Sequence, residues 1–82
     1  MRNFPKIKGN QVVVVSADIF TGHVLDDLGN IVIGDSQKKY TIFESSTDAI
    51  HFIENAMRQN SKIEFVIYRA NEEVLQHIRP SN

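Results

Sequence analysis

The fold is decided by the stretch SSTDAIHFIENAMRQNSKIEFVIY, residues 45–68. Its first part carries apolar residues at positions 49, 50, 53, 56 and 57, a spacing that places them on one face of an α-helix. Ser45 is a good N-cap residue, with Asp48 three positions later in an approximate capping box. Asn60 can adopt the left-handed conformation that ends many helices. We therefore predict an amphipathic helix over residues 46–59.

The second part of the stretch, residues 63–68, predicts the strongest strand of the chain. Alternation places Ile63, Phe65 and Ile67 on one face and the intervening residues on the other. Residues 74–78 then predict a closing strand after a turn at 71–73. The alternative is a short helix over 72–78, capped by Asn71. The strand is favoured because so short a helix is not stable alone and because a hairpin keeps the connection local.

The residues before the helix predict further strands. The β-branched run Val12–Val15 favours a buried strand, residues 24–25 and 31–33 form the arms of a hairpin with Gly29 left-handed in its turn, and 38–43 form another strand. The expected order is β-β-β-β-α-β-β. The fold class is therefore α+β, with a mainly antiparallel sheet of five to six short strands and one helix across one face. The strands on either side of the helix are expected to be parallel, with the option of another strand between them.

Composition limits the class of protein. A chain of 82 residues is expected to form one domain, 1–82, with a basic arm at 1–9 and a tail at 79–82. The absence of cysteine excludes disulfides, thiolate zinc sites and cysteine nucleophiles. With 9 Lys and Arg against 10 Asp and Glu, the chain lacks the basic excess of DNA-wrapping proteins. No apolar run is long enough to cross a membrane and no secretory signal is visible, so we expect a cytoplasmic protein.

Residues that could carry chemistry do not form a recognisable set. The three histidines are far apart in sequence, the glycines lack the spacing of a phosphate loop, and the acidic pairs lie in expected turns. Ser16, Asp18, Thr21 and His23 are the one cluster that resembles a nucleophile, base and orienting group, but no oxyanion-hole motif accompanies them. We therefore expect no catalytic, cofactor-binding or metal-binding residues, and no enzyme activity.

The surplus of apolar strand residues is the main functional feature. A helix of about 14 residues is roughly 21 Å long and covers one face of the sheet, yet several strands are apolar on both faces. We expect an apolar patch on the second face and name Val66, Tyr68, Val12 and Val14 as its candidate interface. Three outcomes could cover the patch: the sheet curls into a partial barrel, it pairs with a second copy as a homodimer, or it docks another protein.

These features favour a small non-enzymatic binding or regulatory module that acts through protein–protein contact on an apolar sheet face. One alternative is a small enzyme or ligand-binding domain that uses residues 16–23. The other is a weak binder of single-stranded nucleic acid through Tyr40, Tyr68, Arg69 and the basic arm, which the negative net charge makes unlike known binders.

Overall fold

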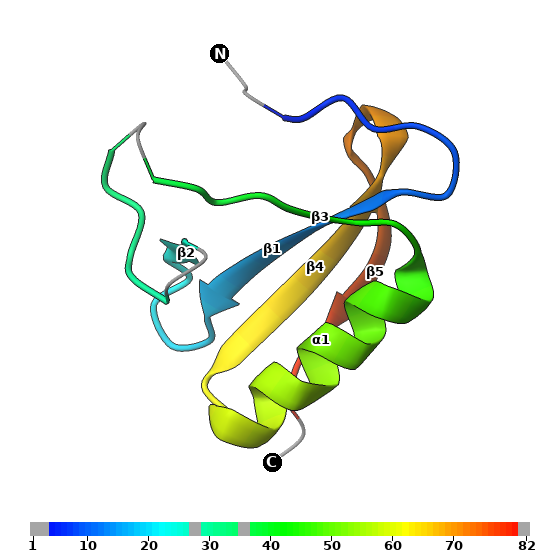
Figure 1. The fold of residues 1–82 in the computed structure, drawn as a ribbon. Helices are drawn as coiled ribbons and strands as arrows, with labels where there is room; N and C mark the ends of the chain where they lie inside the picture. Colours follow the sequence, from blue (N-terminus) through cyan, green and yellow to red (C-terminus); the bar gives the residue numbers. More distant parts are fainter. Residues whose placement is uncertain (1–3, 27–28, 35–36, 81–82) are drawn as a thin grey trace.

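The computed structural model describes residues 4–26, 29–34 and 37–80. Its helix, α1 (Ser46–Gln59), lies across one face of an antiparallel sheet (Figure 1). The strands are β1 (Val12–Asp18), β2 (Val24–Leu25), β3 (Thr41–Phe43), β4 (Ile63–Arg69) and β5 (Glu73–Ile78), with a 3₁₀ turn, η1 (Ala70–Glu72), between the last two. The expected α+β class and the expected helix bounds are confirmed.

Strand β1 is the centre of the sheet. It pairs antiparallel with β4 on one side, and β5 follows β4 as a hairpin. On its other side β1 pairs with β3 near its start and with β2 near its end. Because β3 and β4 both run antiparallel to β1, they are parallel to each other with β1 between them. The expected arrangement of the strands on either side of the helix is confirmed.

Before the helix, the described residues form three strands where four were expected. Residues 31–33 form only a bridge between Ile31 and Leu25, supported by the N–H of Val32, which donates to the Val24 carbonyl at 2.9 Å. The N–H groups of Ile33 and Gly34 donate to the Gln37 side chain instead of to a neighbouring strand. Likewise, pairing of the expected strand 38–43 starts only at Thr41, because β2 occupies the edge of β1 that earlier residues would need. Gly29 has the expected positive φ, 87°; positions 27 and 28 of its turn lie outside the described residues.

The helix ends differ in how well the sequence predicts them. Ser45 is the N-cap as expected, and its hydroxyl accepts a hydrogen bond from the N–H of Asp48 at 3.2 Å. The expectation of a left-handed Asn60 is wrong, because Asn60 is extended, with φ −150°. Its side chain instead accepts a hydrogen bond from the N–H of Lys62 at 2.9 Å, which turns the chain directly toward β4.

Residues 73–78 form a strand, which decides between the two alternatives for this segment. Asn71 has φ 64° and Glu72 has φ 60°. An N-cap residue needs extended backbone, so Asn71 cannot start a helix there. The β4–β5 hairpin also contains a register shift between Ile67 and Tyr68, which marks a β-bulge.

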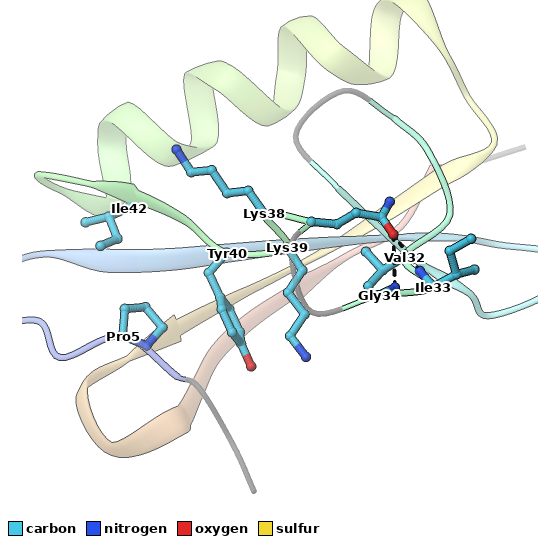
Figure 2. Close-up of a pocket in the computed structure, with 9 residues that line it drawn as sticks. Pro5, Val32, Ile33, Gly34, Lys38, Lys39, Tyr40 and Ile42 are labelled. Atoms are coloured by element: carbon cyan, nitrogen blue, oxygen red, sulfur yellow. Dashed lines mark hydrogen bonds between the residues drawn. The ribbon is translucent and has the colours of Figure 1, made fainter.

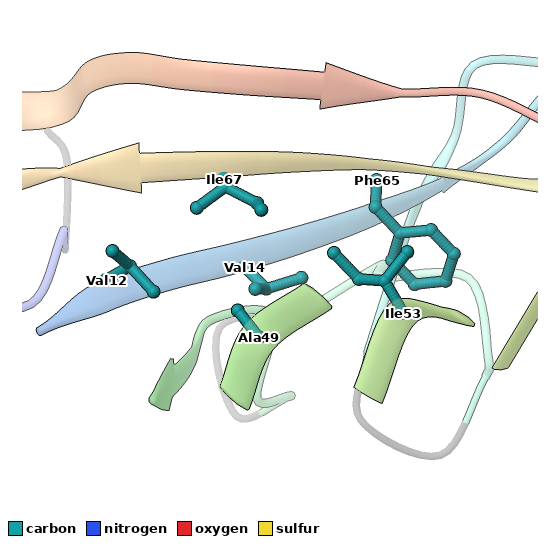
Figure 3. Close-up of a cluster of buried hydrophobic side chains, with 6 residues drawn as sticks. All are labelled: Val12, Val14, Ala49, Ile53, Phe65 and Ile67. Carbon is teal, nitrogen blue, oxygen red and sulfur yellow. The ribbon is translucent and has the colours of Figure 1, made fainter. Parts of the chain in front are cut away.

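The hydrophobic core lies between α1 and the sheet (Figure 3). Helix residues Ala49 and Ile53 pack against inward-facing residues of the two central strands. The buried residues of this cluster are Val12, Val14, Ala49, Ile53, Phe65 and Ile67. Within the described part of the chain, no helix has the length and apolarity needed to cross a membrane.

Candidate functional site on the open sheet face

The four residues expected to form an interface lie on two different faces. Val12 and Val14 are buried beneath α1, whereas Val66 and Tyr68 lie on the face opposite α1, here called the open face. The valines on the open face are Val13 and Val15, which are register partners of Tyr68 and Val66. The structure therefore brings Val66 and Tyr68 together, but not with Val12 and Val14. A run of four valines does not show which alternate residues face the helix, so the β1–β4 register decides which pair is buried beneath it.

The N-terminal segment covers part of the open face. The Phe4 ring lies 5.4 Å from the Tyr40 ring and 5.7 Å from the Tyr68 ring, both in edge-on geometry. Tyr40 immediately precedes β3, Tyr68 belongs to β4, and these strands flank β1, so Phe4 lies over β1. This aromatic cluster (Phe4, Tyr40 and Tyr68) explains why Val13 is 0% exposed although no helix covers it. The segment expected as a basic arm is thus partly packed, and the sheet stays open instead of curling into a barrel.

Beside the aromatic cluster, an open-face hollow of about 380 Å³ remains uncovered. Two of its apolar residues are well exposed: Ile33 by 90% and Ile42 by 45%. Figure 2 shows the hollow between Ile42, Pro5 and Tyr40 at one end and the loop of Val32, Ile33 and Gly34 at the other. Its nine lining residues are Pro5, Val32, Ile33, Gly34, Gln37, Lys38, Lys39, Tyr40 and Ile42.

The Gln37 side chain holds the loop wall of the hollow in shape. Its Oε1 accepts hydrogen bonds from the N–H groups of Ile33 and Gly34 at 2.7 and 3.1 Å. Its Nε2 donates to the Asp26 carboxylate at 2.9 Å and to the Ile31 carbonyl at 3.0 Å. No sequence pattern indicates this role, because a glutamine in a polar segment matches no motif and its partners lie up to 11 positions away.

Replacing Gln37 with leucine is expected to loosen this wall. The substitution removes four hydrogen bonds in a half-exposed position, and we expect the free energy of unfolding to fall by about 1 kcal/mol. Amide hydrogen exchange at Ile33 and Gly34 should become faster, whereas the same change at Gln59, an exposed helix residue, should leave it unchanged. Unaltered exchange at both amides in the Gln37 variant would contradict the assigned role.

The described lining of the hollow is basic. It includes Lys38 and Lys39 and no acidic residue. The Lys39 ammonium lies 5.4 Å from the centre of the Tyr40 ring, within the range of a cation–π contact. In Figure 2, Lys39 and Tyr40 extend away from α1, whereas Lys38 extends toward it. The edge of the hollow therefore presents one positive charge on each side of the sheet.

The region 16–23 uses its polar groups to close the loop after β1. The Asp18 carboxylate accepts hydrogen bonds from the N–H groups of Phe20 and Thr21 at 2.8 and 3.1 Å. The Thr21 hydroxyl accepts one from the N–H of His23 at 3.2 Å. Among the described residues, no hydrogen bond joins the side chains of Ser16, Asp18 and His23. In the described structure, the hydrogen bonds of Asp18 and Thr21 to the backbone serve to close the loop.

Asp18 is expected to contribute to the pH dependence of stability. The N–H of Phe20, followed by that of Thr21, lowers the pKa of the Asp18 carboxyl because both hydrogen bonds favour the ionised form. A pKa that is lower in the folded chain stabilises it above the pKa of the unfolded chain, and this contribution is lost as the pH falls through the folded value. The melting temperature of the Asp18→Asn variant should therefore fall less steeply with acidification than that of the wild type. Glu54→Gln, on the exposed helix surface, serves as the control; identical wild-type and Asp18→Asn slopes in thermal melts below about pH 4 would refute this expectation.

The histidines remain apart in the fold. His23 and His51 are exposed, while His77 Nε2 lies 2.9 Å from Glu64 Oε1, which also pairs with Arg79 Nε at 3.1 Å. A search of residues 4–26, 29–34 and 37–80 finds no group of three or more histidines and carboxylates placed to hold a metal ion. The open-face hollow and the aromatic cluster beside it are therefore the candidate site.

Comparison with protein-family models, with curated proteins and with solved structures found no match to this chain. Its function is therefore argued from the geometry of the open face. That geometry combines exposed isoleucines, a basic edge and a wall held in shape by Gln37.

Proposed function

We propose that this protein is a small non-enzymatic binding or regulatory module that contacts a partner protein through the open-face hollow. The observation that carries the proposal is the exposure of Ile33 and Ile42 around a concave surface of about 380 Å³. Exposed apolar groups that line a hollow and are rimmed by polar residues are typical of interaction sites, because a partner removes them from water. The alternative occupant is a second copy of the chain.

Several observations favour this function over the other two. The Asp18 carboxylate and the Thr21 hydroxyl hold the loop backbone, which speaks against a catalytic role. The Tyr40 and Tyr68 rings contact Phe4, which reduces the aromatic surface available for stacking with bases. We also propose a cytoplasmic location, because secreted domains of this size often depend on disulfides and this sequence has no cysteine.

The proposal is tested by blocking the hollow with charge. In crosslinking experiments in extracts of the source cells, the Ile33→Glu/Ile42→Glu double variant should lose partners that the wild type retains. Phe20→Glu/Val74→Glu is the matched control, because it adds the same charge at two exposed apolar residues outside the hollow. Equal capture by the wild type and the double variant would overturn the proposal.

Light scattering on the purified protein distinguishes a partner protein from a second copy of the chain as the occupant of the hollow. A monomer is expected if the partner is another protein. A dimer that the double variant converts to a monomer would show that the hollow binds a second copy, and would replace the proposed partner.

A further inference from the structure

The sheet has a vacant strand position beside β3. The outer edge of β2 is paired with the backbone of Ile31 and Val32, through the bridge to Leu25 and the hydrogen bond to Val24. β3 pairs with β1 on one side. Among the described residues, no backbone hydrogen bond reaches residues 38–43 from the other side. Within the described part of the chain, the outer edge of β2 is therefore paired and the outer edge of β3 is not.

The open-face hollow lies along this vacant position. On the side of the free edge, the hollow is lined by Lys38, Lys39, Tyr40 and Ile42. At its other end, it is lined by Val32, Ile33 and Gly34. Unpaired strand edges present rows of N–H and C=O groups that pair readily with another extended segment. A segment placed here would have both a backbone partner and an apolar hollow for its side chains.

The lysines indicate the chemistry of such a segment. Lys38 and Lys39 extend to opposite sides of the edge (Figure 2), and the described lining of the hollow contains no acid to neutralise them. A strand added beside them would therefore meet one ammonium group on each face, which favours carboxylates on both faces.

We propose that the vacant position takes an extended acidic segment of the partner protein. The segment pairs with the free backbone edge of β3 and of the residues just before it, buries an apolar side chain against Ile33 and Ile42, and directs carboxylates to Lys38 and Lys39. This is recognition by strand addition, in which main-chain hydrogen bonds supply affinity and side-chain pockets supply specificity. The inference rests on the proposed function, because it assigns the chemistry of the partner at the same hollow.

The charge requirement is tested with a defined probe, a capped fluorescent peptide of seven residues measured by anisotropy. Two adjacent glutamates at its centre point to opposite faces of the added strand, and the flanking residues alternate valine and threonine. The Lys38→Glu/Lys39→Glu variant should bind the peptide at least about 10-fold more weakly, because two ion pairs are lost and the reversed charges repel the glutamates. Lys8→Glu/Lys62→Glu is the matched control, with the same change of net charge at two exposed lysines outside the hollow. If both double variants weaken peptide binding equally, the effect is due to net charge alone and the assigned contacts of Lys38 and Lys39 are wrong.

The backbone requirement is tested with two N-methylated forms of the peptide, one methylated at the odd positions and one at the even positions. Because alternate N–H groups of a strand point to the same edge, only one form should lose binding, by about 10-fold or more. Amide shifts on titration should concentrate in residues 38–43. Equal binding of both forms, or no binding of the unmodified peptide, would overturn strand addition. The crosslinking experiment separates the two proposals when the peptide test fails. If the Ile33→Glu/Ile42→Glu variant still loses partners, the proposed function stands and only strand addition is wrong. If that variant keeps its partners, both proposals are wrong.

Discussion

Replacing Ile53 with alanine is expected to bring this protein close to global unfolding. Ile53 is 0% exposed and lies in the centre of the core beneath α1 (Figure 3). Removing three carbons from such a site costs about 2–5 kcal/mol, because both the transfer free energy and the cavity count against the folded state. A chain of this size has a total free energy of unfolding of only about 4–12 kcal/mol. We expect the melting temperature to fall by about 15–25 °C.

The matched control is the same substitution at Ile33. Ile33 is almost fully exposed, so its replacement should change the free energy of unfolding by less than about 0.5 kcal/mol. Thermal and urea unfolding followed by circular dichroism measure both variants. A loss for Ile53→Ala no larger than that for Ile33→Ala would show that Ile53 is not the centre of the core. The control also shows whether Ile33 can be changed in binding experiments without loss of the fold.

Replacing Phe4 with alanine is expected to have the second largest effect. Phe4 contributes two aromatic contacts and covers β1 on the open face. Each aromatic pair contributes about 0.5–1.5 kcal/mol beyond the apolar area that it buries. We therefore expect the free energy of unfolding to fall by about 2–3 kcal/mol. The ring resonances of Tyr40 and Tyr68 should shift in NMR spectra, because the neighbouring ring is lost.

Phe20→Ala is the control for this change, since Phe20 is an exposed phenylalanine that contacts neither tyrosine ring in the described structure. It should leave both the melting temperature and the tyrosine resonances nearly unchanged. A second variant, Phe4→Leu, separates burial from ring geometry, because leucine keeps apolar cover but lacks the edge-on contacts. Unchanged tyrosine resonances in Phe4→Ala would contradict the aromatic cluster.

The candidate site was only partly predictable from the sequence. The apolar surplus on the second face indicated that an interaction surface should be sought there, and Val66 and Tyr68 do lie on it. The hollow itself depends on contacts that no local pattern reveals. Gln37 shapes its wall through partners on a separate stretch of chain, and the exposure of Ile33 results from the turn that these hydrogen bonds hold.

Local patterns determined α1 and β4 by themselves. Apolar spacing and the Ser45 cap define α1 to the residue, and alternation defines β4, because these signals depend on neighbours within one or two turns. Only the tertiary structure decided which valines of β1 face the helix, what covers the opposite face, and where the sheet lacks a strand. These features depend on strand register and on contacts between distant segments. A shift of one residue would exchange Val13 for Val14 without changing any local preference.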